Sequence, residues 1–127
     1  DDLAFLHRLW REWSPAYDPT RDLDDVRAAL GDLPNLMAAL GYYRAVLDNG
    51  YIDPALDAIE ARAMDVPSQP LLCLHGADDG AIGAEVAEAA RPTVGDNVTI
   101  EIVEDAGHFL HLERSDLVND RILEFLA

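Results

Sequence analysis

The sequence has few of the features that mark secreted, membrane-bound or nucleic-acid-binding proteins. Its 127 residues include one cysteine, Cys73, so an intramolecular disulfide is excluded. Cys73 lies in an apolar run, where we expect it to be a small buried hydrophobic residue. Only 9 Lys and Arg residues oppose 25 Asp and Glu residues, for a formal net charge of -16. Phosphate backbones and anionic membrane surfaces attract clustered cations, so we expect neither nucleic acid nor membrane as a partner.

Long apolar runs and an initiating methionine are also missing. No run reaches the 18 residues of a membrane span, and the acidic start at Asp1 and Asp2 does not resemble a signal peptide. We therefore expect a cytoplasmic protein, and a chain that is a fragment or a processed product. No set of His, Cys and carboxylate residues has metal-ligand spacing, so we expect no metal and no cofactor.

The first half of the chain reads as helical. Apolar residues recur at helical spacing up to Trp13, where Ser14 and Pro15 predict an end to the first helix. Further helices are expected over about residues 23–30, over residues 34–49, and in a short segment after Pro54. A proline-rich connector over residues 66–70 then separates this helical part from a different pattern.

The second half predicts a parallel βαβα unit. The apolar run at residues 71–74 is typical of a strand buried on both faces, and the β-branched residues 98–103 predict a second strand. Helices are expected over residues 84–90 and 115–126, the second with Ser115 as N-cap. Such a buried strand needs neighbours at both edges, and this unit supplies one. We therefore expect a missing N-terminal half or a partner chain to complete the sheet; a homodimer is one such arrangement.

Two loops combine acidic residues with histidine at the carboxyl ends of these strands. One carries His75, Asp78 and Asp79, and the other carries Asp105 and His108. Ligands of parallel α/β folds bind at this edge, so the carboxylates and His108 are expected within reach of each other. A carboxylate that accepts the Nδ1 proton of a histidine orients the ring as a general base.

These segments resemble the C-terminal half of the α/β-hydrolase superfamily. In that family an apolar strand precedes Gly-x-x-Asp, here Gly76 to Asp79, and a Gly-His-Phe segment precedes a helix with Glu, here Gly107 to Glu113. The resemblance implies that Asp79 and His108 are the acid and base of a catalytic triad. The family's order is nucleophile, acid, histidine, and no Gly-x-Ser-x-Gly occurs in this sequence. We therefore expect a nucleophile outside it, and little activity from this chain alone.

The helical half resembles the cap of the same superfamily, which implies a cap over residues 1–64 and hydrolase core over residues 65–127. Residues 40–44 are similar to a cap signature of epoxide hydrolases, with Gly41 and Tyr42 where that signature has Asn and Trp. The resemblance assigns Tyr43 to substrate binding through its hydroxyl. It implies an epoxide hydrolase-like enzyme that acts on a small apolar molecule through a covalent ester.

Several alternatives remain open from the sequence. The enzyme is otherwise a serine esterase or lipase-like or a haloalkane dehalogenase-like hydrolase, or the chain is a non-catalytic module that associates through its sheet edge. Gly76 to Gly80 also fits a nucleophile elbow with Asp78 as the attacking group. For His75 we expect a structural role at a strand end, for His111 packing or capping, and for His7 a surface position.

Overall fold

The computed structural model describes residues 4–47, 53–62 and 65–127, which form two compact units. One unit combines the chain up to Pro19 with Val66–Ala127, and the other is Thr20–Asp65. The second boundary lies beside the predicted division at residue 64. Residues 4–19, in contrast, belong with the C-terminal part rather than with the predicted cap, because Trp10 and Trp13 contact Phe109.

A two-stranded parallel sheet forms the centre of the first unit. Strand β1 (Leu71–Gly76) pairs with β2 (Val98–Val103), and the register matches Leu71 to Val98 and Gly76 to Val103. The fold is therefore mixed α/β, as expected. β1 extends two residues beyond the predicted strand, because the ladder continues through His75 and Gly76. Both strands end in register, so the loops that follow them begin at the same edge.

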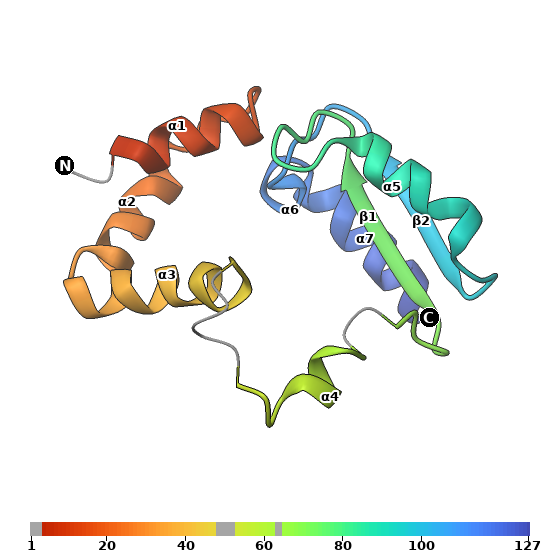
Figure 1. Cartoon of the computed structure of the whole chain (residues 1–127). Helices are drawn as coiled ribbons and strands as arrows, with labels where there is room; N and C mark the ends of the chain where they lie inside the picture. The colour runs from red at the N-terminus through yellow and green to blue at the C-terminus, as the bar shows by residue number, and fades with distance from the viewer. Residues whose placement is uncertain (1–3, 48–52, 63–64) are drawn as a thin grey trace. The chain divides into compact units, whose positions relative to one another are not determined.

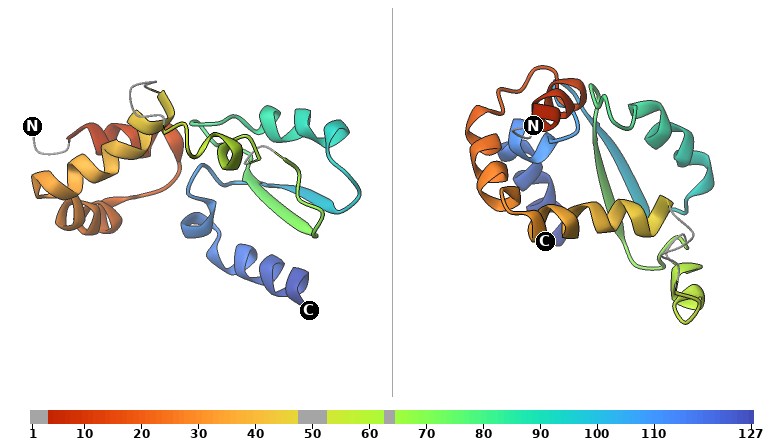
Figure 2. Two further views of the ribbon diagram at one scale, coloured as in Figure 1. Left: turned by 60° about the horizontal axis from the view of Figure 1, so that its bottom comes forward. Right: turned by 60° about the vertical axis from the view of Figure 1, so that its left-hand side comes forward.

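Helices cover both faces of this sheet (Figures 1 and 2). α5 (Ala84–Ala90) lies on one face and continues into the short 3₁₀ helix η2 (Arg91–Thr93), whereas α7 (Ser115–Leu126) lies on the other. Arg91 joins η2 to the sheet, since its guanidinium donates to the carbonyl of Ile100 at 2.7 Å. The predicted N-cap is wrong: Arg114 precedes α7 and the Ser115 hydroxyl makes no capping bond.

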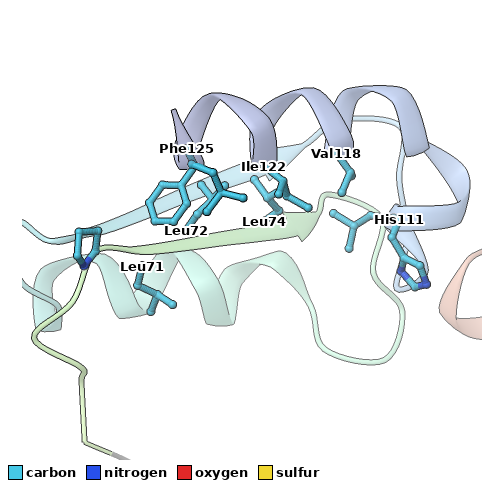
Figure 3. Close-up of a pocket in the computed structure, with 10 residues that line it drawn as sticks. Leu71, Leu72, Leu74, His111, Val118, Ile122 and Phe125 are labelled. Atoms are coloured by element: carbon cyan, nitrogen blue, oxygen red, sulfur yellow. The ribbon is translucent and has the colours of Figure 1, made fainter.

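The predicted apolar stripe of α7 is only partly buried. Val118 is buried against the sheet, but Ile122 and Phe125 are about 40% exposed. The reason is that the sheet is narrow. Among the described residues no strand pairs with the free edge of β1, so nothing covers this part of α7. An apolar groove of about 460 Å³ remains between β1 and α7 (Figure 3). It is lined by Pro70, Leu71, Leu72, Leu74, Leu110, His111, Val118, Ile122, Phe125 and Leu126.

Two helices bring further residues to the loops after the strands. α1 (Ala4–Trp13) ends where predicted, and its Trp10 ring stacks on Phe109 with a centroid distance of 4.0 Å. α6 (Leu110–Glu113) directly follows Phe109. Trp10, Val103 and Ala106 are buried there, so the core of this unit reaches the edge at which both strands end.

The second unit contains α2 (Thr20–Leu30), α3 (Leu33–Leu47) and α4 (Asp57–Glu60). α2 begins three residues earlier than predicted and buries Leu23, whereas no residue of α3 is buried. The predicted end of the third helix at residue 49 lies outside the described residues. The short helix expected after Pro54 is present among the described residues as the single turn of α4.

Cys73 is half-buried in β1 rather than fully buried. Within the described ranges, no helix combines the length and apolar character needed to cross a bilayer.

Gly76→Ala should destabilise the first unit. A Cβ at this position would lie 2.2 Å from the carbonyl oxygen of Gly107 and 2.5 Å from that of Ala106. Backbone atoms cannot move aside cheaply, so we expect a loss of roughly 1–3 kcal/mol in the free energy of unfolding, measured by urea titration. Gly41→Ala is the matched control, because a Cβ there meets nothing within 4 Å and alanine favours a helix. Equal losses in both variants would contradict the steric argument.

Candidate active site

Asp79 and His108 meet where the loops after β1 and β2 converge. The Nδ1 atom of His108 lies 3.0 Å from Oδ2 and 3.1 Å from Oδ1 of Asp79. The Asp79 side chain is 6% exposed, whereas the His108 side chain is 31% exposed. The structure thus brings together the two residues that the sequence assigned to acid and base. The acid is enclosed and the ring is open to solvent on part of its surface.

Backbone amides hold the carboxylate of Asp79. Oδ1 accepts hydrogen bonds from the N–H groups of Ala81 at 2.8 Å and Ile82 at 2.9 Å. Burial of this carboxyl acts to raise its pKa, but the hydrogen bonds from Ile82, His108 and Ala81, together with the charge of His108, outweigh it. The pKa of Asp79 is therefore below its ordinary value of 3.8, and the group is ionised at neutral pH.

The ionised acid determines which nitrogen of His108 carries a proton. A carboxylate can only accept, so the Nδ1 atom must donate to it. In the neutral ring, Nε2 is then the basic nitrogen. A histidine in this tautomer can take a proton at Nε2 while the carboxylate stabilises the imidazolium that forms.

The carbonyl of Trp13 joins the two loops. It accepts the N–H of His108 at 2.9 Å and the N–H of Gly80 at 3.2 Å. Gly80 follows the acid directly, so one oxygen atom fixes the backbone beside both members of the pair. The Trp13 ring also meets the His108 ring edge to face, with centroids 4.9 Å apart.

Ser14 and Glu113 complete the support of the histidine loop. The Ser14 side chain is fully buried, and its hydroxyl accepts the N–H of Phe109 at 3.0 Å. The carboxylate of Glu113 accepts the N–H of Gly107 at 3.0 Å. The amides before and after His108 are therefore both held by side chains, and its own amide is held by Trp13.

Close backbone contact explains two glycines of this site. A Cβ on Gly80 would lie 1.8 Å from the carbonyl oxygen of Glu12, and a Cβ on Gly107 would lie 2.7 Å from Ser14 Cα and from the Trp13 carbonyl oxygen. Only glycine allows the end of α1 to cross both loops at this distance. This role of the two glycines was not predicted from the sequence, although Trp13, Ser14 and Pro15 mark the helix end that crosses them.

The structure separates Asp79 from its neighbour Asp78. The Asp78 side chain is exposed, and the interaction with His108 is made by Asp79. A nucleophile elbow is a strained turn, yet among the described non-glycine residues only Asp105 has a positive φ, of 55°. The elbow alternative for Asp78 is therefore not supported.

The remaining histidines and Tyr43 differ in their relation to the pair. His75 is close to it, with Nε2 3.6 Å from Oδ2 of Asp79. His111 is exposed and contacts Phe109, and His7 is half-buried on α1. Tyr43 is 61% exposed on α3, in the other unit, and its role in substrate binding stays a prediction. Within the residues the structure describes, no three His, Cys, Asp or Glu side chains cluster as a metal site.

Asp79→Asn should flatten the acid limb of the stability profile. A folded-state pKa below 3.8 means that the ionised carboxylate stabilises the fold above the ordinary pKa, and that this stability is lost as pH falls through the folded pKa. Urea midpoints measured from pH 6 down to about pH 2 should therefore fall less in the Asn variant than in the wild type. The matched control, Asp78→Asn, removes an exposed carboxylate and should keep the wild-type slope. Identical slopes for the wild type and the Asp79 variant would refute the assignment.

Ser14→Ala should destabilise the histidine loop. The change leaves the N–H of Phe109 without its acceptor at a fully buried position, which costs about 1–3 kcal/mol. Chemical denaturation measures the loss, and hydrogen exchange at Phe109 should accelerate. Ser115→Ala is the control, since that hydroxyl caps nothing and the effect should stay within about 0.5 kcal/mol. A Ser14 variant as stable as this control would contradict the role.

Comparison with known proteins adds no relative. No family model matches the chain, and neither the curated proteins nor the solved structures contain a match.

Proposed function

We propose that this chain carries the acid and the base of an α/β-hydrolase-like enzyme. The observation that carries the proposal is the bond from the Nδ1 atom of His108 to the buried, amide-held carboxylate of Asp79. An ordinary surface ion pair would not need an enclosed acid with two backbone donors. A general base needs both an oriented ring and an accessible second nitrogen.

The proposed reaction uses a nucleophile from outside this sequence. With a carboxylate nucleophile and an epoxide, the nucleophile attacks a ring carbon, the bond from that carbon to the epoxide oxygen breaks, and this oxygen takes up a proton from water, which leaves a hydroxyalkyl ester. The Nε2 atom of His108 then takes a proton from a water molecule, which attacks the carbonyl carbon of the ester. The acyl C–O bond breaks, and the imidazolium returns the proton to the departing oxygen, which releases the diol and regenerates the carboxylate. Asp79 stays ionised throughout and stabilises the imidazolium.

The surroundings of His108 favour an apolar substrate. Trp13 and Phe109 contact the ring, and the Ile82 side chain, which follows Asp79 in the same loop, is 50% exposed. A small apolar molecule such as an epoxide is the first substrate class in the proposal, because the segment around Tyr43 resembles that of epoxide hydrolases. An ester or a haloalkane is the alternative, and the type of nucleophile distinguishes them.

The proposal also includes further sheet beside β1. Among the described residues β1 pairs with β2 alone, and apolar side chains of β1 and α7 line the groove beside it. Additional strands, from residues outside this sequence or from a partner chain, would pair with this edge and cover the apolar groove. The same strands are the expected source of the nucleophile.

The test compares His108→Gln and Asp79→Asn with the wild type, using the protein at its native length and an epoxide, an aryl ester and a haloalkane as substrates. Asp79→Asn should lower kcat by on the order of 10⁴, because the carboxylate no longer selects the tautomer. His108→Gln should abolish turnover. With a carboxylate nucleophile, alkylation does not require the base, so intact mass of the Gln variant should show the ester with the epoxide or haloalkane.

The outcomes separate the alternatives. A serine nucleophile needs the base for attack, so the Gln variant would then form no adduct and the wild type would hydrolyse aryl esters. Asp78→Asn is the matched control and should retain wild-type kcat, since its side chain is exposed and Asp79 makes the bond to His108. Wild-type kcat in His108→Gln, or no turnover of any of the three substrates by the wild type, would reject the proposed function.

A further inference from the structure

His75 is a partly enclosed histidine for which the proposed reaction has no use. It is the penultimate residue of β1, and its side chain is 14% exposed. Its Nε2 atom lies 2.7 Å from the carbonyl oxygen of Ile82 and 3.6 Å from Oδ2 of Asp79. The sequence predicts a structural role at a strand end for His75, and these two contacts show which groups that role involves.

The contact with Ile82 determines the proton position in this ring. A carbonyl oxygen can only accept, so the Nε2 atom of His75 carries a proton and donates. His108 donates from Nδ1 instead. The two rings around Asp79 therefore use opposite nitrogens, which makes them distinguishable by spectroscopy.

Ile82 is the link between His75 and the acid. Its N–H donates to Oδ1 of Asp79, and its carbonyl accepts from His75. Both the N–H and the carbonyl of Ile82 are thus hydrogen-bonded. Through these two bonds the His75 ring on β1 is linked to the amide that holds the Asp79 carboxylate. The loop between Asp79 and Gly83 has no regular secondary structure, so its position depends on contacts such as those of Gly80 with the Trp13 carbonyl and of Ile82 with His75.

We propose that His75 is a positioning residue for the pair of Asp79 and His108. This inference rests on the proposed function for its effect on catalysis, but not for its effect on geometry. By holding the Ile82 carbonyl, His75 keeps the amide donors directed at Oδ1. Its Nε2–H group is committed to the Ile82 carbonyl, and the 3.6 Å from Nε2 to Oδ2 is a neighbouring contact rather than a second hydrogen bond, so the effect of His75 on the carboxylate passes through Ile82.

The experiment uses His75→Phe, His75→Gln and His75→Asn in the protein at its native length. Phe keeps the ring volume without a donor, Gln places an amide N–H near the position of Nε2, and Asn places it near Nδ1. The first readout is the Nδ1 proton signal of His108 in histidine-labelled protein, assigned by its loss in Asp79→Asn. It should shift or broaden in the Phe and Asn variants and return in Gln.

Turnover is the second readout. Displacement of the acid should lower kcat by up to about a hundredfold in the Phe variant, with KM little changed and kcat largely restored by Gln. His111→Phe is the matched control, because His111 is exposed and its aromatic contact with Phe109 is kept. It should leave both readouts at wild-type values.

The two readouts separate failure of this inference from failure of the proposed function. If neither the wild type nor any variant turns over substrate, the proposed function fails. The His108 proton signal alone then decides whether His75 positions the pair. A purely structural His75 would lower the unfolding midpoint in Phe while the signal and kcat stay at wild-type values, and this result overturns the inference. A wild-type protein without an Asp79-dependent Nδ1 proton overturns it as well.

Discussion

The candidate site depends on one backbone acceptor, the carbonyl oxygen of Trp13. The N–H groups of Gly80 and His108 both donate to it, so the loop of the acid and the loop of the base are fixed to a common point. Parallel strands in register bring these loops to the same edge but leave their separation undetermined. Because backbone atoms fix that separation, the contact between Asp79 and His108 needs little further side-chain ordering. Such preorganisation is what a general base requires.

The parts of the fold that follow local patterns could be predicted from the sequence. The second strand and the helices α5 and α7 have the predicted bounds, because β-branched runs and helical spacing are read within a few residues. The approach of Asp79 to His108 was also predictable, since both residues lie in the loops that follow two parallel strands. The choice between Asp78 and Asp79 rested on the distance from Gly76, and the burial of Asp79 agrees with that choice.

Other features had no local signal. The bond from Phe109 to Ser14 spans 95 residues. The acceptor at Trp13 is a backbone carbonyl, which every residue type has, so the sequence does not mark it. Residues 4–19 therefore read as the first part of a helical cap, although they support the histidine loop. The amphipathic pattern of α7 likewise overestimated its burial. A pattern identifies the apolar face of a helix but not the amount of sheet available to cover it.

The hydrogen bonds that the Asp79 carboxylate accepts limit the chemical role that it can have. Its Oδ1 atom accepts from Ala81, Ile82 and His108, and Oδ2 faces both His108 and His75. Three N–H groups, of Ala81, Ile82 and His108, donate to this carboxylate, and its side chain is only 6% exposed, so it is poorly placed to attack a substrate. Protonating it would exchange an acceptor for a donor and break one of these bonds. Asp79 is thus suited to remain ionised and orient the ring. In the proposed reaction this leaves Nε2 of His108 as the proton acceptor and a different group as the nucleophile.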